Sequence, residues 1–125
     1  MFTYKQSTGS LTSSKSTKAL GLCYSGHGQG VNNPVLQNVA MIGPIPVGTY
    51  TIEAPITHPT CGPEAMRLTP NPGTNTFGRG GFLMHGDNSL LNHTASEGCI
   101  IAPRGIRDLV AAARAAGDNQ LTVIS

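Results

Sequence analysis

The sequence predicts a mainly-β domain with one helix in its C-terminal part, and three features of the 125 residues support this. Glycine and proline are frequent, with 16 and nine copies, which favours short strands joined by turns over a helical bundle. Apolar and β-branched residues recur in short runs bounded by such turns. Residues 104–116 instead carry apolar residues at helical spacing. With 38% hydrophobic residues, the chain can form a core, and its length fits a single domain, residues 1–125.

The predicted strands are short and follow one another along the chain. Residues 2–6 alternate between apolar and polar side chains, and an apolar run occupies residues 19–24. β-branched residues after the rigid 43–48 turn predict a strand over 49–53. Further short strands are expected at 11–12, 66–69, 81–85, 99–102 and 121–124, with loops at 25–34, 58–63 and 70–80.

The predicted helix is amphipathic. Apolar residues recur at positions i, i+3, i+4 and i+7, and they are Ile106, Leu109, Val110 and Ala113. We expect these four side chains on its buried face. Gly117 is well placed to end the helix.

The charge and hydropathy of the chain argue against several classes of protein. A net charge of +2, 11% charged residues and no tryptophan do not favour a nucleic-acid partner. No apolar run approaches the ~20 residues that a membrane span needs. Residues 1–20 are rich in Ser, Thr and Lys and lack the apolar segment of a secretory signal. We therefore expect a protein made in the cytoplasm without a signal peptide.

Two residues with catalytic chemistry stand at the ends of neighbouring predicted strands. His85 ends the apolar strand 81–85, and Cys99 begins the strand 99–102. If these strands lie side by side, the imidazole and the thiol meet at one edge of the sheet. A free thiol has a pKa of ~8.5, and an adjacent imidazole can take its proton. We predict Cys99 as nucleophile and His85 as base; a buried, unreactive cysteine beside a core histidine is the alternative.

Glycines adjoin both of these residues. Gly98 lacks a Cβ, which allows a sharp turn and close approach of a substrate. The backbone N–H groups of Gly98 and Cys99 are candidate donors to an oxyanion. His85 needs an acceptor for its other ring nitrogen so that the right tautomer faces the thiol. Both the carbonyl of Gly86 and the carboxylate of Asp87 are candidates for that acceptor.

The stretch Ser96-Glu97-Gly98-Cys99-Ile100, with His85-Gly86 upstream, resembles the signature of L,D-transpeptidase (YkuD-type) catalytic domains. Blocks at 24–26, 32–34, 43–50, 67–70 and 77–82 resemble a branch of small L,D-transpeptidase-like toxins delivered by type VI secretion. The resemblance runs from about Tyr4 to the C-terminus.

This resemblance implies an L,D-transpeptidase-like β-sandwich that acts on the tetrapeptide stems of peptidoglycan without a cofactor. Cys99 would attack the carbonyl of the third stem residue and release the terminal D-alanine. Water, a free D-amino acid or a second stem would be the acceptor. The resemblance also implies action in the periplasm of a target bacterium, an immunity protein as partner and a secretion-apparatus carrier.

The chain departs from the common pattern at two positions that bear on substrate binding. Glu97 stands where many members have His, and Ile101 stands where many have Arg. Arg79 and Arg104 are candidate replacements, because a guanidinium fork suits a carboxylate; the alternative is a solvated surface charge. Further candidates for contact with substrate are Ser96, Tyr24, Ser25 and His27.

Other histidines and cysteines permit alternatives. His93 could join His85 and Cys99 in a zinc set, but the spacing matches no strong zinc template, so no metal is predicted. Cys23 and Cys61 could form a disulfide in an oxidising periplasm, although Cys23 also fits a small core residue. A catalytically inactive binding module of the same fold and a zinc-dependent hydrolase are the alternative functions.

Overall fold

The structure is a computed structural model, and it describes residues 1–15, 19–59, 61–86 and 98–125. The first strands are β1 (Phe2–Lys5), β2 (Ser10–Ser13), β3 (Ala19–Leu22), β4 (Tyr24–Ser25) and β5 (Gly48–Ile52). Two 3-10 turns, η1 (Gly28–Gly30) and η2 (Pro34–Leu36), lie between β4 and β5. The later elements are β6 (Ile56–His58), β7 (Gly62–Pro70), β8 (Leu83–His85), β9 (Ile100–Ile101), the helix α1 (Arg104–Ala115) and β10 (Gln120–Ile124).

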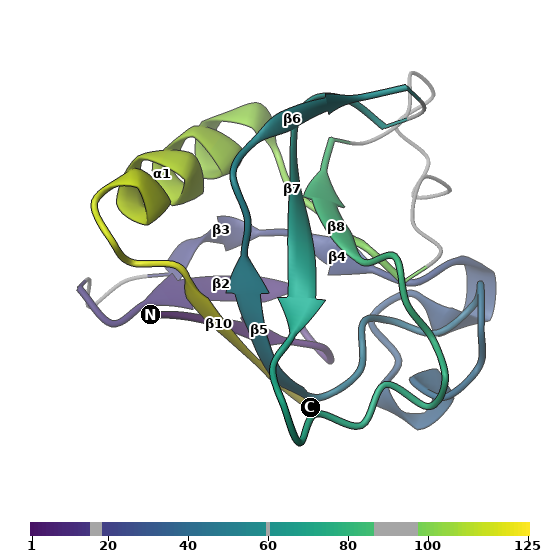
Figure 1. Ribbon diagram of the computed structural model, residues 1–125. Helices are drawn as coiled ribbons and strands as arrows, with labels where there is room; N and C mark the ends of the chain where they lie inside the picture. The colour runs from purple at the N-terminus through teal and green to yellow at the C-terminus, as the bar shows by residue number, and fades with distance from the viewer. Residues whose placement is uncertain (16–18, 60, 87–97) are drawn as a thin grey trace.

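The strands form one hydrogen-bonded path that nearly closes on itself (Figure 1). The order is β3-β2-β1-β10-β5-β7-β8-β9-β4, and β6 pairs with β7 off this path. The two ends of the path, β3 and β4, are consecutive in the chain and separated only by Cys23. The mainly-β class is therefore confirmed, and the residues that the structure describes contain one α-helix, as predicted. The packing of two sheets as a sandwich stays a prediction.

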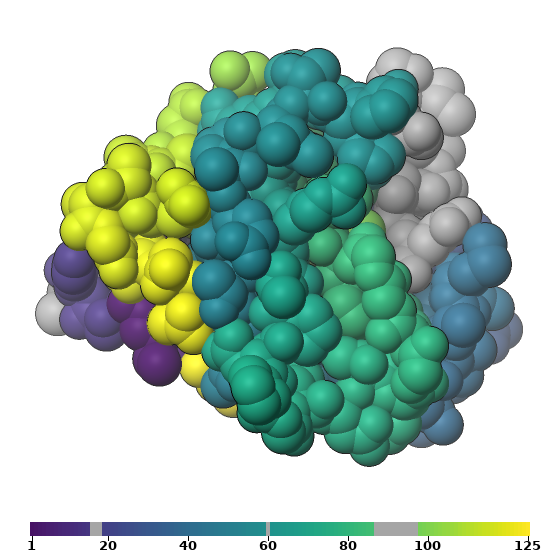
Figure 2. Space-filling model, viewed as in Figure 1, coloured from purple at the N-terminus to yellow at the C-terminus, as the bar shows by residue number. Residues whose placement is uncertain are grey.

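The core lies between the curved sheet and the inner face of α1, and alternation along the strands fills it. In β1, Phe2 and Tyr4 are buried, and in β10 the same holds for Leu121 and Val123. These two strands pair in parallel, with Phe2 opposite Leu121. Burial of each large apolar side chain stabilises the fold by roughly 1.5–3 kcal/mol. Figure 2 shows the teal residues of β5 to β7 at the centre of one face, between the yellow C-terminal residues and the blue segment that precedes β5.

The helix has the predicted extent, but its buried face differs from the predicted one. Ile106 and Val110 are buried as expected, and Ala113 packs partly against the core. Leu109, however, is 54% exposed, whereas Arg107 is only 8% exposed. The prediction for Leu109 was wrong. The spacing of apolar residues cannot show that the Arg107 side chain is buried by the hydrogen bonds that it makes to backbone carbonyls.

The hairpin of β6 and β7 is longer than the sequence suggested. Residues 58–63 were expected to be loop, and a strand was expected only at 66–69, yet β7 runs over nine residues. Ile56 pairs with Ala65, and His58 pairs with Gly62. β6 lies off the main path. Pro55 and Pro59, which flank it, have no backbone N–H to donate to a neighbouring strand, and this position does not require one. Within the part of the chain that the structure describes, no helix has the length and hydropathy to cross a bilayer.

Candidate active site

β8 and β9 bring His85 and Cys99 to one cleft. The strands pair in parallel, with Met84 opposite Ile100 and His85 opposite Ile101. Cys99 directly precedes β9, and the alternation of side chains places it on the same face as His85. Both residues line a cleft of about 540 Å³. Its other lining residues are Ala40, Met41, His58, Cys61, Arg79, Gly80, Gly81 and Leu83. The cleft therefore contains a thiol and an imidazole together.

The imidazole of His85 is held by the backbone beside it. Its side chain is 3% exposed, and Nδ1 lies 2.8 Å from the carbonyl oxygen of Gly86. A carbonyl oxygen only accepts, so Nδ1 carries a hydrogen, and in the neutral imidazole Nε2 keeps its lone pair. Of the two acceptors that the sequence offered, Gly86 thus makes this contact; Asp87 lies outside the described residues.

Cys99 sits after a tight turn that Ser25 supports. Its Sγ lies 3.9 Å from the carbonyl oxygen of Gly81, within reach of a weak S–H donor. Gly98 has φ +123°, a conformation that favours glycine. The buried hydroxyl of Ser25 donates to the carbonyl of Gly98 at 3.5 Å and accepts from the N–H of Ile45 at 2.8 Å. Ser25 is therefore placed to support the turn before Cys99.

The other two cysteines lie in different surroundings. All three thiols are free, so the Cys23–Cys61 bridge is not formed. Cys23 is buried, and burial raises the pKa of its thiol to about 12. Cys61 lines the same cleft as Cys99, and partial burial raises the pKa of its thiol as well. A thiol with a raised pKa is a poor nucleophile at neutral pH.

The two arginines that the sequence offered for substrate binding are placed differently. Arg79 lines the cleft. Arg104 does not; it lies on the surface at the start of α1, where its Nε is 2.8 Å from Glu64 and 3.3 Å from Asp108. These two carboxylates hold Arg104 away from Cys99.

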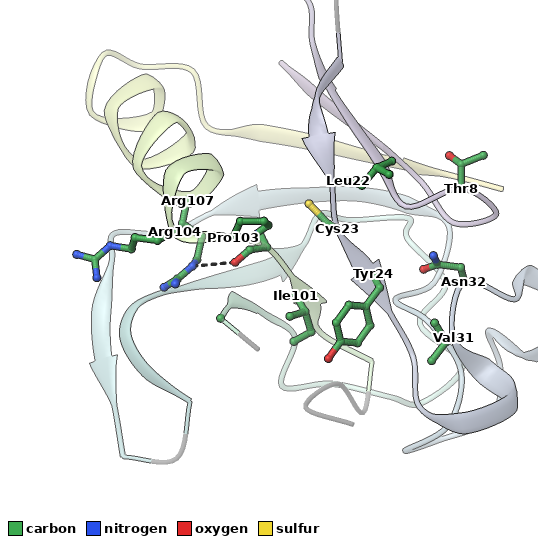
Figure 3. A pocket seen from close by; sticks show the side chains of 12 residues that line it. Thr8, Leu22, Cys23, Tyr24, Val31, Asn32, Ile101, Pro103, Arg104 and Arg107 are labelled. Carbon is green, nitrogen blue, oxygen red and sulfur yellow. Dashed lines mark hydrogen bonds between the residues drawn. The ribbon is translucent and has the colours of Figure 1, made fainter. Parts of the chain in front are cut away.

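A second cavity, of about 630 Å³, has none of its lining residues in common with the cleft (Figure 3). Tyr24 and Arg104 line it together with Cys23, Ile101 and Arg107. In Figure 3 the Arg104 guanidinium points away from the apolar residues Leu22, Tyr24 and Ile101. Tyr24 thus faces this cavity rather than the one around Cys99. His27 precedes η1 and is not among the described residues that line either cavity, and Ser96 lies outside the described residues.

Arg107 is a residue near the site that the sequence did not single out. Its Nε donates to Ala102 at 3.1 Å, and its Nη1 donates to Pro63 at 2.9 Å and to Glu64 at 3.3 Å, all three at backbone carbonyls. The N–H of Ala102 in turn donates to the carbonyl of His85 at 2.9 Å. Burial lowers the pKa of Arg107. The only signal for this role would have been the position of Arg107 on the buried face of the helix. Apolar periodicity instead assigned that face to Leu109.

The Arg107 guanidinium also leaves little room for a side chain at residue 86. A Cβ at Gly86 would lie 2.8 Å from Nη2 of Arg107. We expect Gly86→Ala to lower the free energy of unfolding by about 1–3 kcal/mol, because the guanidinium or the Gly86 backbone must move. Urea unfolding of Gly86→Ala, Arg107→Ala and the double variant measures this effect. The double variant should lose less than the sum of the two single losses, and strictly additive losses would contradict the contact.

Metal-binding residues do not gather in the described part of the chain. No group of three or more His, Cys, Asp or Glu side chains in residues 1–15, 19–59, 61–86 and 98–125 could hold a metal ion. The zinc set considered from the sequence includes His93, which lies outside these ranges.

Comparison with protein families identifies the chain. The family model of the Tlde1 domain matches residues 21–124, a stretch that runs from β3 to β10 and includes both His85 and Cys99. The chain belongs to the Tlde1 domain family. This family consists of type VI secretion effectors, which are antibacterial toxins. The resemblance to small toxins delivered by type VI secretion is confirmed at the level of the family. No curated protein and no solved structure matches the chain.

Proposed function

We propose that this Tlde1 domain is a cysteine-dependent enzyme that cuts the tetrapeptide stems of peptidoglycan. The observation that carries the proposal is that Cys99 and His85 line one cleft, with the Gly86 carbonyl accepting from Nδ1 of the imidazole. The substrate class comes from the resemblance of the His85-Gly86 and Ser96–Ile100 stretches to L,D-transpeptidases. The type VI secretion family supports a bacterial target.

The first step is activation of the thiol. Nδ1 of His85 donates to Gly86, so the lone pair of Nε2 is available to take the Cys99 proton. The resulting thiolate is the nucleophilic form of cysteine. His85 is buried and held by a neighbouring backbone carbonyl, which keeps the base in one orientation.

The thiolate attacks the carbonyl carbon of the third stem residue. A C–S bond forms, and the carbonyl oxygen takes the negative charge of the tetrahedral intermediate. Backbone N–H groups of Gly98 and Cys99 are the donors that we assign to this oxyanion. When the intermediate collapses, the C–N bond breaks, and the proton on His85 passes to the departing amine of D-alanine. A thioester between Cys99 and the shortened stem remains.

An acceptor then releases the thioester. Water gives the carboxylic acid and therefore L,D-carboxypeptidase activity. The amine of a free D-amino acid gives exchange, and the side-chain amine of a second stem gives a crosslink. In each case His85 takes a proton from the attacking group and returns it to the thiolate as the C–S bond breaks.

The biological role follows from the family. We place the activity in the periplasm of a target bacterium, because peptidoglycan stems are located there. As a member of an effector family the protein is expected to have a cognate immunity protein and to travel with a component of the secretion apparatus. Expression of the domain with a periplasmic signal should stop growth only when no immunity protein is present.

The test is mass spectrometry of purified tetrapeptide muropeptides incubated with the protein, with and without glycine or a D-amino acid. We expect loss of 1 D-alanine per stem or its exchange, and the product ratio identifies the acceptor. Cys99→Ala is the matched control and should leave the stems unchanged. Stems that stay intact with the wild-type protein under both conditions would reject the substrate and favour the binding-module alternative.

A further inference from the structure

Arg79 lines the same cleft as Cys99, and its guanidinium donates to backbone carbonyls. Nη1 donates to the carbonyls of Gln37 and Pro44, the latter at 2.9 Å, and Nη2 donates to the carbonyl of Gly43 at 2.9 Å. The guanidinium carbon lies 5.6 Å from the centroid of the Phe82 ring, within the range of a cation–π interaction. Four contacts therefore fix the orientation of this cation.

The same guanidinium packs against the turn that precedes Cys99. A Cβ at Gly98 would meet Nη2 of Arg79 at 2.3 Å, so any side chain at this position would require the guanidinium to move. Burial lowers the pKa of Arg79, whereas electrostatic attraction to Tyr50 and Cys99 raises it.

We propose that Arg79 is a positioning residue that stabilises the thiolate of Cys99 rather than a group that binds the carboxylate of the substrate. A fixed positive charge next to a cysteine favours the ionised thiol. The bonds to Gln37, Gly43 and Pro44 already occupy three of the five guanidinium donors, including both on Nη1, and they restrict how the group can turn toward a substrate carboxylate. The inference rests on the proposed function only in taking Cys99 as the reactive thiol.

The test is the pH dependence of Cys99 alkylation by iodoacetamide, followed by peptide mass spectrometry. In this reaction the thiolate sulfur forms a bond to the CH₂ carbon and iodide leaves, so the rate follows the thiolate fraction. We expect Arg79→Met to move the midpoint upward by about one pH unit and to slow alkylation below the midpoint about tenfold. Arg79→Lys keeps the charge and should retain most of the wild-type rate.

Arg114→Met is the matched control for the loss of an arginine. Arg114 donates to the backbone carbonyl of Ile52 at 3.2 Å from α1 and is not among the described residues that line the cleft. The pH midpoint of Cys99 alkylation in Arg114→Met should equal that of the wild type. An unchanged midpoint in a folded Arg79→Met variant, with folding checked by circular dichroism, would overturn the proposal.

A measurement on the wild-type protein covers the case in which Arg79→Met does not fold. A cation beside the thiolate attracts anionic iodoacetate more than neutral iodoacetamide. The ratio of the two alkylation rates at Cys99 should exceed the ratio for free cysteine and should fall as salt is added. Equal ratios would count against the proposal. Neither experiment contains peptidoglycan, so failure to cut stems and failure of the Arg79 proposal are separate results.

Discussion

Cys99→Ser is expected to reduce the rate of D-alanine release by on the order of 10⁴-fold, with little change in stability. The serine hydroxyl fills nearly the same space, but a base such as His85 does not ionise it to a comparable extent at neutral pH. Single-turnover release of D-alanine from a tetrapeptide stem measures the rate, and thermal unfolding measures stability. Intact-protein mass spectrometry should detect the thioester only on the wild-type chain.

Cys61→Ser is the control for this variant, because Cys61 is a second thiol in the same cleft. Burial raises the pKa of Cys61, so its thiolate is scarce at neutral pH, and we expect Cys61→Ser to keep the rate within about threefold of the wild type. The opposite pattern, with Cys61→Ser inactive and Cys99→Ser active, would assign the nucleophile to Cys61.

His85→Gln is expected to slow D-alanine release at neutral pH by about 10³-fold, since the glutamine amide cannot take a proton from Cys99. The loss should shrink as the pH rises, because hydroxide then ionises the thiol without a base. The measurement is the pH profile of the turnover number between pH 6 and pH 10. His58→Gln is the matched control: His58 lines the cleft, and its Nδ1 accepts from the N–H of Cys61 at 3.1 Å.

The outcome that matters here is the shape of the profile. If His85 only supports the fold, His85→Gln should lose activity equally at every pH. An equal loss from His58→Gln and His85→Gln would remove the reason to assign the base to His85.

Much of the fold could be predicted because, in the helix and strands, most side chains that the apolar pattern assigns to the core are the ones that are buried. Alternation in β1 and apolar runs in β8 and β9 determine which side chains enter the core, and tertiary packing did not override them. The strand-end positions of His85 and Cys99 were visible for the same reason. Two strand ends can be recognised along the chain, and a parallel pairing then brings them together.

The parts of the site that the sequence did not reveal are those made of backbone. Arg79 was considered for a substrate carboxylate, yet carbonyls of residues 37–44 accept its hydrogen bonds. Every residue has a carbonyl, so nothing in the sequence marks these acceptors. Arg107 escaped notice in the same way, because its acceptors lie on β7 and after β9. The sequence likewise left both Gly86 and Asp87 open as the partner of His85.

The position of β10 has a consequence for the time course of folding. β10 follows all the other described strands along the chain, yet it lies between β1 and β5 within the sheet. The ribosome synthesises His85 and Cys99 before it synthesises this strand. The sheet that supports both residues therefore has a gap until Gln120–Ile124 is inserted. Pairing of β1 with β10 must close a loop that spans nearly the whole chain, which is a slow step. A nascent chain released before β10 should therefore lack activity even though it already contains both reactive side chains.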